Sequence, residues 1–325
     1  MESMYIFSVC ISALNEEENL EACIESVLNA SKGHDCELLL LDNGSCDRTQ
    51  EIMRKYSEVE NCRIISFKEN MRLQYARNFL LKNCHGKFAV FLDADGVVNN
   101  DYFSVLVENL SPRFSIYSGP VIEQSVDENV FYELHYATLA KSDPNFLIGA
   151  NFVVEVSVAL EVGGFPDITV SRGDESPLIA LMLKNGSKQL LVTELIASNH
   201  FIASSSDFIR SFYYEGQNAY LCMLYFDEPF FAKSMYKGFF LSSLLLLIFG
   251  LLTLNVGFVL TGMALIVTKL VCQRKYWIQF FYHFLKIASL SSAKGFAVTI
   301  AAHITHELGF WLSMLTRKKP NCWKG

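Results

Sequence analysis

Charged residues are scarce in this chain. Only 19% of its 325 residues are Asp, Glu, Lys or Arg, whereas 51% are hydrophobic. Acidic residues outnumber basic ones, and the formal net charge is -7. This balance argues against a nucleic-acid partner, which would require a basic face on the protein. The length allows one large domain plus a second unit, or two domains.

The sequence also lacks any C-x-x-C pair, although it contains nine cysteines. Closely spaced cysteine pairs are typical of zinc sites, and an even number of cysteines is typical of a disulfide framework. Neither pattern is present, so we expect reduced thiols in a reducing, cytosolic setting. The first fourteen residues are apolar but have no basic region, which predicts a first strand rather than a signal peptide.

A long stretch without any charge extends from Gly238 to Thr268. As one helix it would be about 46 Å long, against about 30 Å for the hydrocarbon core of a bilayer. The segment T-L-N-V-G near its middle contains turn-forming residues, so we expect a hairpin of two short helices over about 238–268. Lys and Arg residues flank both ends, and the positive-inside rule then places both ends and the N-terminal domain in the cytoplasm.

Two further segments extend this predicted membrane-associated region over residues 233–325. Residues 275–292 are rich in aromatic residues and amphipathic, as expected for a helix that lies in the membrane interface. The apolar segment over about 295–316 carries polar groups and a basic end, so partial insertion is at least as expected as a full span. The alternative for the whole tail is the buried core of a soluble domain.

Short apolar runs alternate with helical patterns in the first hundred residues. The expected strands cover 7–13, 37–41, 63–67 and 88–92, and the expected helices cover 15–28, 47–56 and 75–83. This alternation with short loops predicts a parallel, doubly wound α/β sheet. Ligands in such sheets bind beyond the carboxyl ends of the strands, where Asp42, Asp93 and Asp95 are expected.

The strand over 88–92 leads into L-D-A-D-G, in which Asp93 and Asp95 are two residues apart. Residues at this spacing in a strand point to the same side, so the two carboxylates can converge on one cation. Hard divalent ions such as Mg²⁺ and Mn²⁺ take oxygen ligands and bridge substrate phosphates. The pair therefore suits a nucleoside diphosphate. The alternative is a strand-to-turn junction whose aspartates accept backbone N–H bonds.

Six motifs occur in one order: V-C-I-S-A-L-N-E-E-E-N-L, D-N-G-S-C-D-R-T, A-R-N before F-L-D-A-D, G-A-N, V-G-G-F and G-D-E-S-P-L. In this order, over about residues 7–200, they resemble the family 2 glycosyltransferases, and the tail is similar to that of membrane-attached members. The resemblance implies a GT-A domain over 1–232, which is a Rossmann-like, mostly parallel sheet with flanking helices. It also implies a metal-dependent, inverting sugar transfer from a nucleotide sugar to an acceptor hydroxyl.

On the donor side, the resemblance implies that Asp42 accepts a hydrogen bond from the nucleotide base. Leu14, Asn15 and Glu16 would line the nucleoside pocket, and Arg77 could reach a phosphate. The residues alone leave a structural alternative for each of these roles. Asp42 could be a turn residue, the segment 14–16 could be a helix N-cap with an acidic first turn, and Arg77 could form an ion pair with an acid.

The same resemblance implies a divalent metal, Mn²⁺ or Mg²⁺, bound directly by Asp95, with Asp93 contacting ribose or metal. His200, after the last expected strand, would complete the metal shell or contact the diphosphate, although a lone histidine is more often structural. The donor would be a UDP- or GDP-linked sugar. The acceptor would be a glycan or a lipid-linked molecule at the cytoplasmic face of a membrane, with membrane lipid as a further partner.

Sugar transfer to a hydroxyl requires a base. The family places this base in G-E-D at the N-terminus of a helix, whereas here the two acids are in the opposite order, Asp174 and then Glu175. By position Glu175 matches the usual aspartate, and we favour it over Asp174 as the base. The alternative is that both acids only stabilise the N-terminus of the helix.

Three residues depart from the family's pattern. Ser12 stands in the usual proline position, Asn43 replaces the second aspartate of D-D-G-S, and Arg72 stands where glycine is frequent. None of these removes an expected metal ligand. Two other functions stay open: transfer to a polyprenyl phosphate, which is already an anion and needs no base, and a catalytically inactive protein that binds sugar nucleotides.

Overall fold

The computed structural model describes residues 4–123, 149–167, 174–199, 247–249 and 251–272. It also describes the single residues or pairs 210, 213–214, 216–217, 304–305, 308 and 312. The chain forms two compact units. The first comprises Met1–Ser125, Pro144–Thr169 and Gly173–Ile202, and the second comprises Val126–Asp143, Val170–Arg172 and Ala203–Gly325.

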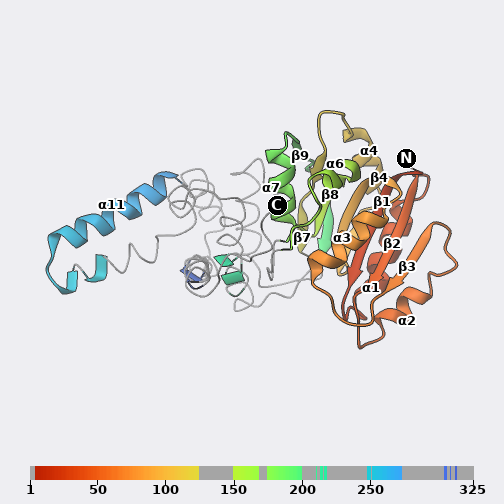
Figure 1. Ribbon diagram of the computed structural model, residues 1–325, viewed down its shortest axis with the longest axis horizontal. Coiled ribbons are helices and arrows are strands. Elements are labelled where there is room, and N and C mark those ends of the chain that lie inside the picture. Colours follow the sequence, from red (N-terminus) through yellow and green to blue (C-terminus); the bar gives the residue numbers. More distant parts are fainter. Residues whose placement is uncertain are drawn as a thin grey trace, which may run out of the picture. The chain divides into compact units, whose positions relative to one another are not determined.

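A seven-stranded sheet, in the order β3-β2-β1-β4-β8-β6-β9, forms the centre of the first unit (Figure 1). Its strands are β1 (Tyr5–Ala13), β2 (Cys36–Asp42), β3 (Cys62–Ser66), β4 (Gly86–Asp93), β6 (Ile116–Ser118), β8 (Asn151–Glu155) and β9 (Gln189–Leu191). The pairs β1–β2, β1–β4, β2–β3 and β6–β9 are parallel, whereas β8 is antiparallel to β4 and β6. The mostly parallel α/β sheet predicted from the sequence is therefore confirmed.

The helices of the first unit cover both faces of this sheet. They are α1 (Leu20–Ala30), α2 (Thr49–Arg54), α3 (Leu73–Asn83), α4 (Tyr102–Asn109), α6 (Val156–Glu161) and α7 (Glu175–Lys184). Side chains of α1, α2 and α4 share one core with Val90 and Leu92 of β4, and those of α3, α6 and α7 share a second core with Ala89 and Phe91. Because both faces are buried, the strands read as continuous apolar runs.

A second, three-stranded sheet follows the D-A-D-G segment. It contains β5 (Gly96–Val98), β10 (Ala197–Asn199) and β7 (Val121–Glu123), in the order β5-β10-β7. The strand β10 is antiparallel to β5, with Asn199 opposite Gly96. The last described residue of β10 thus lies beside the end of the D-A-D-G turn.

The helix α1 begins at Leu20 rather than at Asn15, where the sequence predicts it. The residue Asn15 has a φ of 56°, in the left-handed region that helices do not use. The backbone N–H groups of residues 15–17 donate to side chains of the loop after β2 and of the first residue of α2: Asn15 N to Ser45 Oγ at 3.0 Å, Glu16 N to Thr49 Oγ1 at 2.8 Å and Glu17 N to Asp47 Oδ2 at 3.1 Å. These bonds hold residues 15–17 as a loop against the end of β2.

In the second unit, a turn separates helical residues 251–252 from α11 (Val256–Cys272). At this turn Leu254 has a φ of 51°, and Asn255 Oδ1 accepts a hydrogen bond from Phe258 N at 3.3 Å. The turn lies within T-L-N-V-G, where the sequence predicts one.

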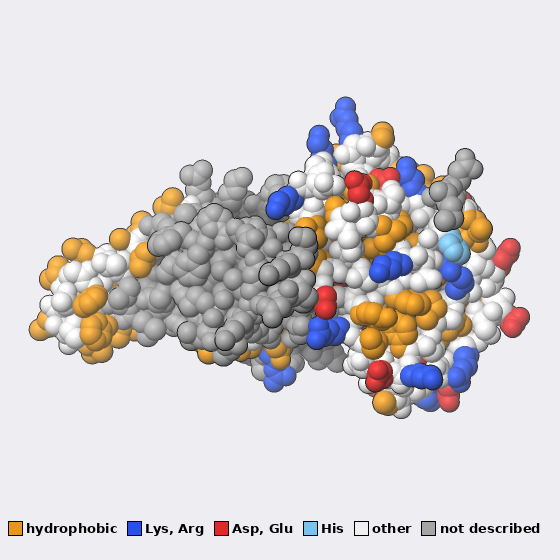
Figure 2. Space-filling view, in the orientation of Figure 1, with side chains coloured by type: hydrophobic (Ala, Val, Ile, Leu, Met, Phe, Trp, Pro, Cys, Tyr) orange, Lys and Arg blue, Asp and Glu red, His pale blue; other side chains and the backbone are white. Residues whose placement is uncertain are grey.

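Apolar side chains are exposed along this part of the chain (Figure 2). Leu252 is 80% exposed and Leu254 is 89% exposed. Among the residues that the structure describes, no helix has both the length and the apolar character needed to cross a bilayer. Residues 238–246, 275–292 and most of 295–316 lie outside the described residues, so the hairpin, the interfacial helix and the terminal helix stay predictions.

Candidate active site

The candidate site lies at the carboxyl ends of the three central parallel strands. In the register of these strands, Ala13 of β1 lies opposite Asp42 of β2, and Ser12 of β1 lies opposite Asp93 of β4. The two aspartates therefore flank the end of β1, at the edge where α/β sheets bind their ligands.

The two aspartates of L-D-A-D-G lie on different pieces of backbone. Asp93 is the last residue of β4, and Asp95 lies in the turn before β5, so strand alternation does not set the direction of its side chain. Both carboxylates nevertheless lie near the thiol of Cys23: burial raises the pKa of Cys23, and the negative charges of Asp95 and Asp93 raise it further. The two acids therefore approach one region from different backbone positions.

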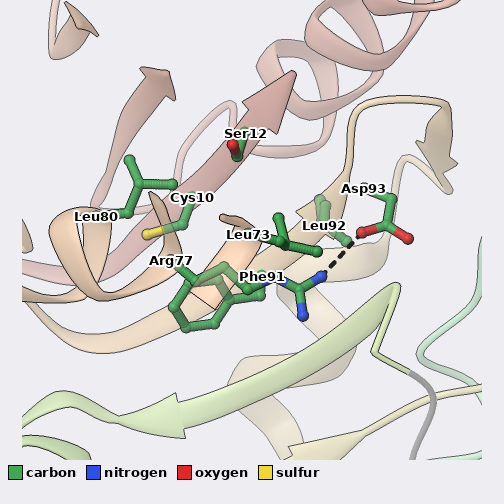
Figure 3. Close-up of a pocket in the computed structure, with 8 residues that line it drawn as sticks. All are labelled: Cys10, Ser12, Leu73, Arg77, Leu80, Phe91, Leu92 and Asp93. Carbon is green, nitrogen blue, oxygen red and sulfur yellow. Dashed lines mark hydrogen bonds and ion pairs between the residues drawn. The ribbon is translucent and has the colours of Figure 1, made fainter. Parts of the chain in front are cut away.

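A buried arginine, Arg77 of α3, connects the end of β4 with the start of α7. Its Nη1 donates to both Oδ1 and Oδ2 of Asp174 at 3.0 Å. Its Nη2 donates to Asp93 Oδ1 at 3.0 Å, as drawn in Figure 3, and to the carbonyl oxygen of Gly149 at 3.1 Å. The side chain of Arg77 is only 6% exposed, whereas that of Asp93 is 43% exposed. Of the two alternatives for Arg77, the structure shows the ion pair with an acid.

Burial alone would lower the pKa of Arg77, but its acidic neighbours outweigh this effect and raise it. The guanidinium also lies over the ring of Phe152, with its central carbon 5.6 Å from the ring centroid.

A small pocket between β1, β4 and α3 has this arginine in its wall (Figure 3). The pocket is lined by Cys10, Ser12, Leu73, Arg77, Leu80, Phe91, Leu92 and Asp93.

The two acids of G-D-E-S-P-L have different surroundings. Glu175, the first residue of α7, is 7% exposed, and its Oε2 lies 3.8 Å from Nη1 of Arg77. Burial and the charge of Asp174 raise the pKa of Glu175 to about 7, while Arg77 opposes this shift. A Cβ atom on Gly149 would collide with Oε2 of Glu175, so glycine makes room for this carboxyl group. Glu175 is therefore a carboxyl that can exchange a proton near neutral pH.

On the other side of β1, Asp42 is buried and accepts a hydrogen bond from the backbone N–H of Ser45 at 3.0 Å. A longer contact of 3.4 Å joins its Oδ2 to Nε2 of Gln50. The carboxyl group of Asp42 thus makes the turn contact that the sequence leaves as an alternative to base binding.

Asn43 fastens the loop after β3 against the end of β2. Its Oδ1 accepts from Met71 N at 2.9 Å, and its Nδ2 donates to Met71 O at 2.8 Å. An aspartate has no N–H to donate, so it could make only the first of these bonds. The next residue, Gly44, has a φ of 82°, and a Cβ atom there would meet the backbone of Glu69 and Asn70. The departure from D-D-G-S therefore has a structural reason.

The segment 14–16 leaves β1 beside Asp42. Leu14 and Glu16 are half-buried, while Asn15 is exposed and its Oδ1 accepts from Cys46 N at 2.8 Å. Burial raises the pKa of Glu16, and the charge of Asp93 adds to this effect. The carboxyl group of Glu16 thus lies within the electrostatic influence of Asp93, whereas the side chain of Asn15 holds the loop.

Asn78 was not among the predicted site residues, although it belongs to the A-R-N motif. Its Nδ2 donates to Phe165 O at 2.6 Å, and its Oδ1 accepts from Phe165 N at 2.8 Å. Gly164, with a φ of 75°, allows the close approach of this side chain. The motifs A-R-N and V-G-G-F thus form one structural joint between α3 and the segment after α6. In the sequence, the only signal for this contact is that both motifs are present.

Within the described ranges, no three His, Cys, Asp or Glu side chains converge on a common metal position. Asp93 and Asp95 provide two carboxylates, and Mg²⁺ or Mn²⁺ usually completes its shell with water and substrate phosphates. The oxygen donors present therefore fit such an ion together with a nucleotide. The predicted ligand His200 lies outside the described residues.

The family model described as glycosyl transferase family 2 matches residues 8–158. Glycosyltransferase GlyA of Streptococcus pneumoniae is 27% identical over 126 residues, which are 38% of this chain and 18% of that protein. Glycosyltransferase AglE of Haloferax volcanii is 27% identical over 179 residues, which are 51% of this chain and 58% of that protein. The chain therefore spans less than two thirds of the length of either relative.

Among solved structures, the mannosyltransferase PcManGT from Pyrobaculum calidifontis, in complex with GDP-Man and Mn²⁺, has a TM-score of 0.59 to this chain. The alignment covers 96% of this chain and 86% of that chain at 15% identity, which is a likeness of fold. The architecture is accordingly a mixed, GT-A-like α/β fold. Residues 8–158 therefore carry the sequence pattern of glycosyl transferase family 2, and the relatives named above are glycosyltransferases.

Proposed function

We propose that this protein transfers a sugar from a UDP- or GDP-linked donor to an acceptor hydroxyl, with a divalent metal and with inversion at the anomeric carbon. The observation that carries this proposal is the cluster of Arg77, Asp174 and Glu175, which are buried, with the partly exposed Asp93 at the carboxyl edge of the sheet. It unites a donor-side carboxylate with a carboxyl group suited to proton transfer, as sugar transfer to a hydroxyl requires.

On the donor side, Asp42 would accept a hydrogen bond from the base, and Leu14, Asn15 and Glu16 would line the nucleoside pocket. Asp93 and Asp95 would hold Mn²⁺ or Mg²⁺. When bound, this ion would offset the negative charge that develops on the departing nucleoside diphosphate. The complex of PcManGT with GDP-Man and Mn²⁺ supports this choice of donor and metal class.

On the acceptor side, Glu175 would act as the base. Both carboxylate oxygens of Asp174 already accept hydrogen bonds from Arg77, whereas the nearest distance between Glu175 and this arginine is 3.8 Å. The carboxylate of Glu175 removes the proton of the acceptor hydroxyl, whose oxygen attacks the anomeric carbon opposite the diphosphate. The bond between carbon and diphosphate oxygen then breaks, and the proton on Glu175 returns to solvent.

We place this reaction at the cytoplasmic face of a membrane, with a glycan or a lipid-linked acceptor. The support is the charge-free stretch of residues 238–268, its basic flanks and the exposed apolar side chains around the turn at Leu254.

The test is a screen of sugar nucleotides for Mn²⁺-dependent release of nucleoside diphosphate, with and without membrane lipid extract. We expect release with one donor class, and loss of release in Asp95→Ala with the protein still folded. Binding of nucleotide without any turnover would instead support an inactive binding protein. Full activity in Asp174→Asn/Glu175→Gln would contradict the base assignment and favour an acceptor that is already an anion, such as a polyprenyl phosphate.

A further inference from the structure

The guanidinium of Arg77 joins two parts of the candidate site that lie far apart in the sequence. Toward the donor side it binds Asp93 at the end of β4, and toward the acceptor side it binds Asp174, 97 residues away in the chain. The carbonyl oxygen of Gly149 accepts a further bond from Nη2. The side chains of Arg77 and Asp174 are almost completely buried, so the contact between them is made in a region with little water, whereas Asp93 is partly exposed.

We propose that Arg77 is a positioning residue, which holds both carboxylate oxygens of Asp174 through Nη1 and thereby leaves Glu175, seated against Gly149, as the one carboxyl that receives the acceptor's proton. This inference rests on the proposed sugar transfer and deepens it. It also explains the reversed order of the two acids: the shorter Asp174 pairs with the arginine, and the longer Glu175 extends past it to Gly149.

The charges around Glu175 support this role. The charged groups that face it from the surrounding described elements are Arg77 of α3, Asp93 at the end of β4, and Asp174. The three acids Asp93, Asp174 and Glu175 thus share one positively charged group, the guanidinium of Arg77. Two of these acids, Asp174 and Glu175, are adjacent in sequence and buried. Without the arginine, Asp174 would be an uncompensated buried anion beside the base, and like charges at short distance disfavour ionisation.

A contact between Arg77 and a donor phosphate is the competing role, and the geometry argues against it. To bind a phosphate, this buried guanidinium would have to give up one of the carboxylates or the carbonyl oxygen that it now holds. A cation bound at Asp93 would, moreover, compete with Arg77 for that carboxylate. The two roles therefore predict opposite changes in nucleotide affinity when Arg77 is replaced.

The experiment compares Arg77→Gln and Arg77→Lys with Arg72→Gln. Arg72 is a matched control, because it lies just before α3 and its ion pair with Asp167, at 2.9 Å, is exposed. For each variant we would measure thermal unfolding, the affinity for UDP and GDP with Mn²⁺ by calorimetry, and the pH dependence of kcat/KM for the acceptor.

For Arg77→Gln we expect kcat to fall by about 100-fold or more, and the acidic limb of the pH profile to move to higher pH by about one unit. The affinity for the nucleoside diphosphate with Mn²⁺ should stay the same or increase. Arg77→Lys should restore the pH profile in part, because it keeps the charge without the two nitrogens that bind Asp174 and Asp93 at once. Arg72→Gln should behave like the wild type in all three measurements.

A loss of nucleotide affinity by about tenfold or more in Arg77→Gln, with an unchanged pH profile, would overturn the proposal and make Arg77 a phosphate ligand. If Arg77→Gln does not fold, Arg77→Gln/Asp174→Asn removes both members of the pair, and the same affinity criterion applies to it.

A second readout separates this inference from the proposed function. Isotope-edited infrared spectroscopy of the carboxyl band that is lost in Glu175→Gln reports the protonation of Glu175 without any turnover. A higher protonated fraction in Arg77→Gln than in the wild type at one pH supports the inference, even if no sugar nucleotide proves to be a donor. Equal fractions would contradict it, even if the wild type transfers sugar.

Discussion

Asp174 and Glu175 are neighbours in the chain but have different environments. Asp174 accepts both of its hydrogen bonds from Nη1 of Arg77, whereas Glu175 is buried against Gly149 at a greater distance from the arginine. Pairs of acids whose surroundings separate their pKa values commonly divide the roles of acid, base and charge partner between them. At the scale of the residue, the different roles that we propose for Asp174 and Glu175 follow from the contacts of one guanidinium, that of Arg77.

The raised pKa of Glu175 predicts a dependence of stability on pH. In the folded protein the pKa of Glu175 is about 7, above the ordinary value of 4.5 for a glutamate, so the folded state binds this proton more tightly than the unfolded state. The stability that this proton contributes is fully present below the pKa of Glu175 in the unfolded state. It is lost as the pH rises through the pKa of Glu175 in the folded state. We therefore expect Glu175→Gln to be more stable than the wild type at pH 8, by on the order of 1–3 kcal/mol, and similar to it at pH 4.

The measurement is chemical denaturation at both pH values without added metal. A stability difference that is the same at pH 4 and pH 8 would contradict the raised pKa. The same variant should lose transfer activity at every pH.

Gly149→Ala tests the position of the Glu175 carboxyl group. The added methyl group would occupy the space of Oε2 of Glu175, so the carboxyl must turn away. We expect transfer to fall by about 10- to 100-fold, since misplacement by about 1 Å can have such an effect. Gly186→Ala is the control: this glycine has a φ of 94° and no neighbouring atom near a Cβ, so the variant should lose about 1–2 kcal/mol of stability through backbone strain but no activity. Equal activity in the two variants would refute the placement of Glu175.

At the scale of the element, the loops at the carboxyl edge are held by side chains that imitate backbone pairing. Asn43 pairs with both backbone groups of Met71, and Asn78 pairs with both backbone groups of Phe165. Each amide uses one N–H as donor and its oxygen as acceptor, as a peptide group does. These two joints connect the loop after β3, α3 and the segment after α6 with the sheet.

Asn43→Asp restores the residue that the family's motif would have, and we expect it to destabilise this chain. The aspartate loses the bond from Nδ2 and brings a negative oxygen close to the carbonyl oxygen of Met71. The expected loss is about 1–3 kcal/mol in the free energy of unfolding, as for other unsatisfied buried groups. Asn100→Asp, at an exposed position before α4, is the control and should change stability little. A neutral Asn43→Asp would show that the joint is dispensable.

The elements with a strong periodic signal could be predicted from the sequence, and the short ones could not. β1, β2 and β4 are apolar runs buried on both faces, so their existence and parallel order followed from pattern alone. β5, β7 and β10 have three residues each, too few for any periodicity, and their sheet was missed. The start of α1 was predicted too early, because side chains of a distant loop capture the backbone of residues 15–17.

The candidate site was predictable in the same uneven way. Asp42 and Asp93 could be placed at one edge, because they end the two strands that flank β1 in a parallel arrangement. The partner of Arg77 could not be predicted, since the pairing with Asp174 depends on how α7 is packed and not on any local pattern. Asp95 shows the limit of strand arguments, because the chain turns directly after Asp93.

At the scale of the whole molecule, the proposal joins a sheet-based transferase unit to a second unit that associates with membrane. We expect the full chain to float with phospholipid vesicles, and Leu252→Asp or Leu260→Asp to weaken this association. A charged side chain at the centre of a bilayer costs about 3 kcal/mol on insertion scales. Both leucines are exposed in the structure.

Val107→Asp is the matched control for this flotation assay, because Val107 is an exposed apolar residue of α4 in the first unit. It should float like the wild type. A wild-type chain that stays with the soluble fraction, or a control that loses flotation equally, would contradict membrane association through the second unit.

The central claim is that Asp93 and Asp95 hold a cation that in turn holds the phosphates of a nucleotide. The most direct measurement is a crystal structure of the protein with Mn²⁺ and UDP or GDP, with diffraction data collected at the manganese absorption edge. The account predicts an anomalous peak at about 2.1 Å from an oxygen of Asp95 and in contact with the diphosphate, while Arg77 stays paired with Asp174. A bound nucleotide without such a peak, or a peak remote from both aspartates, would contradict it.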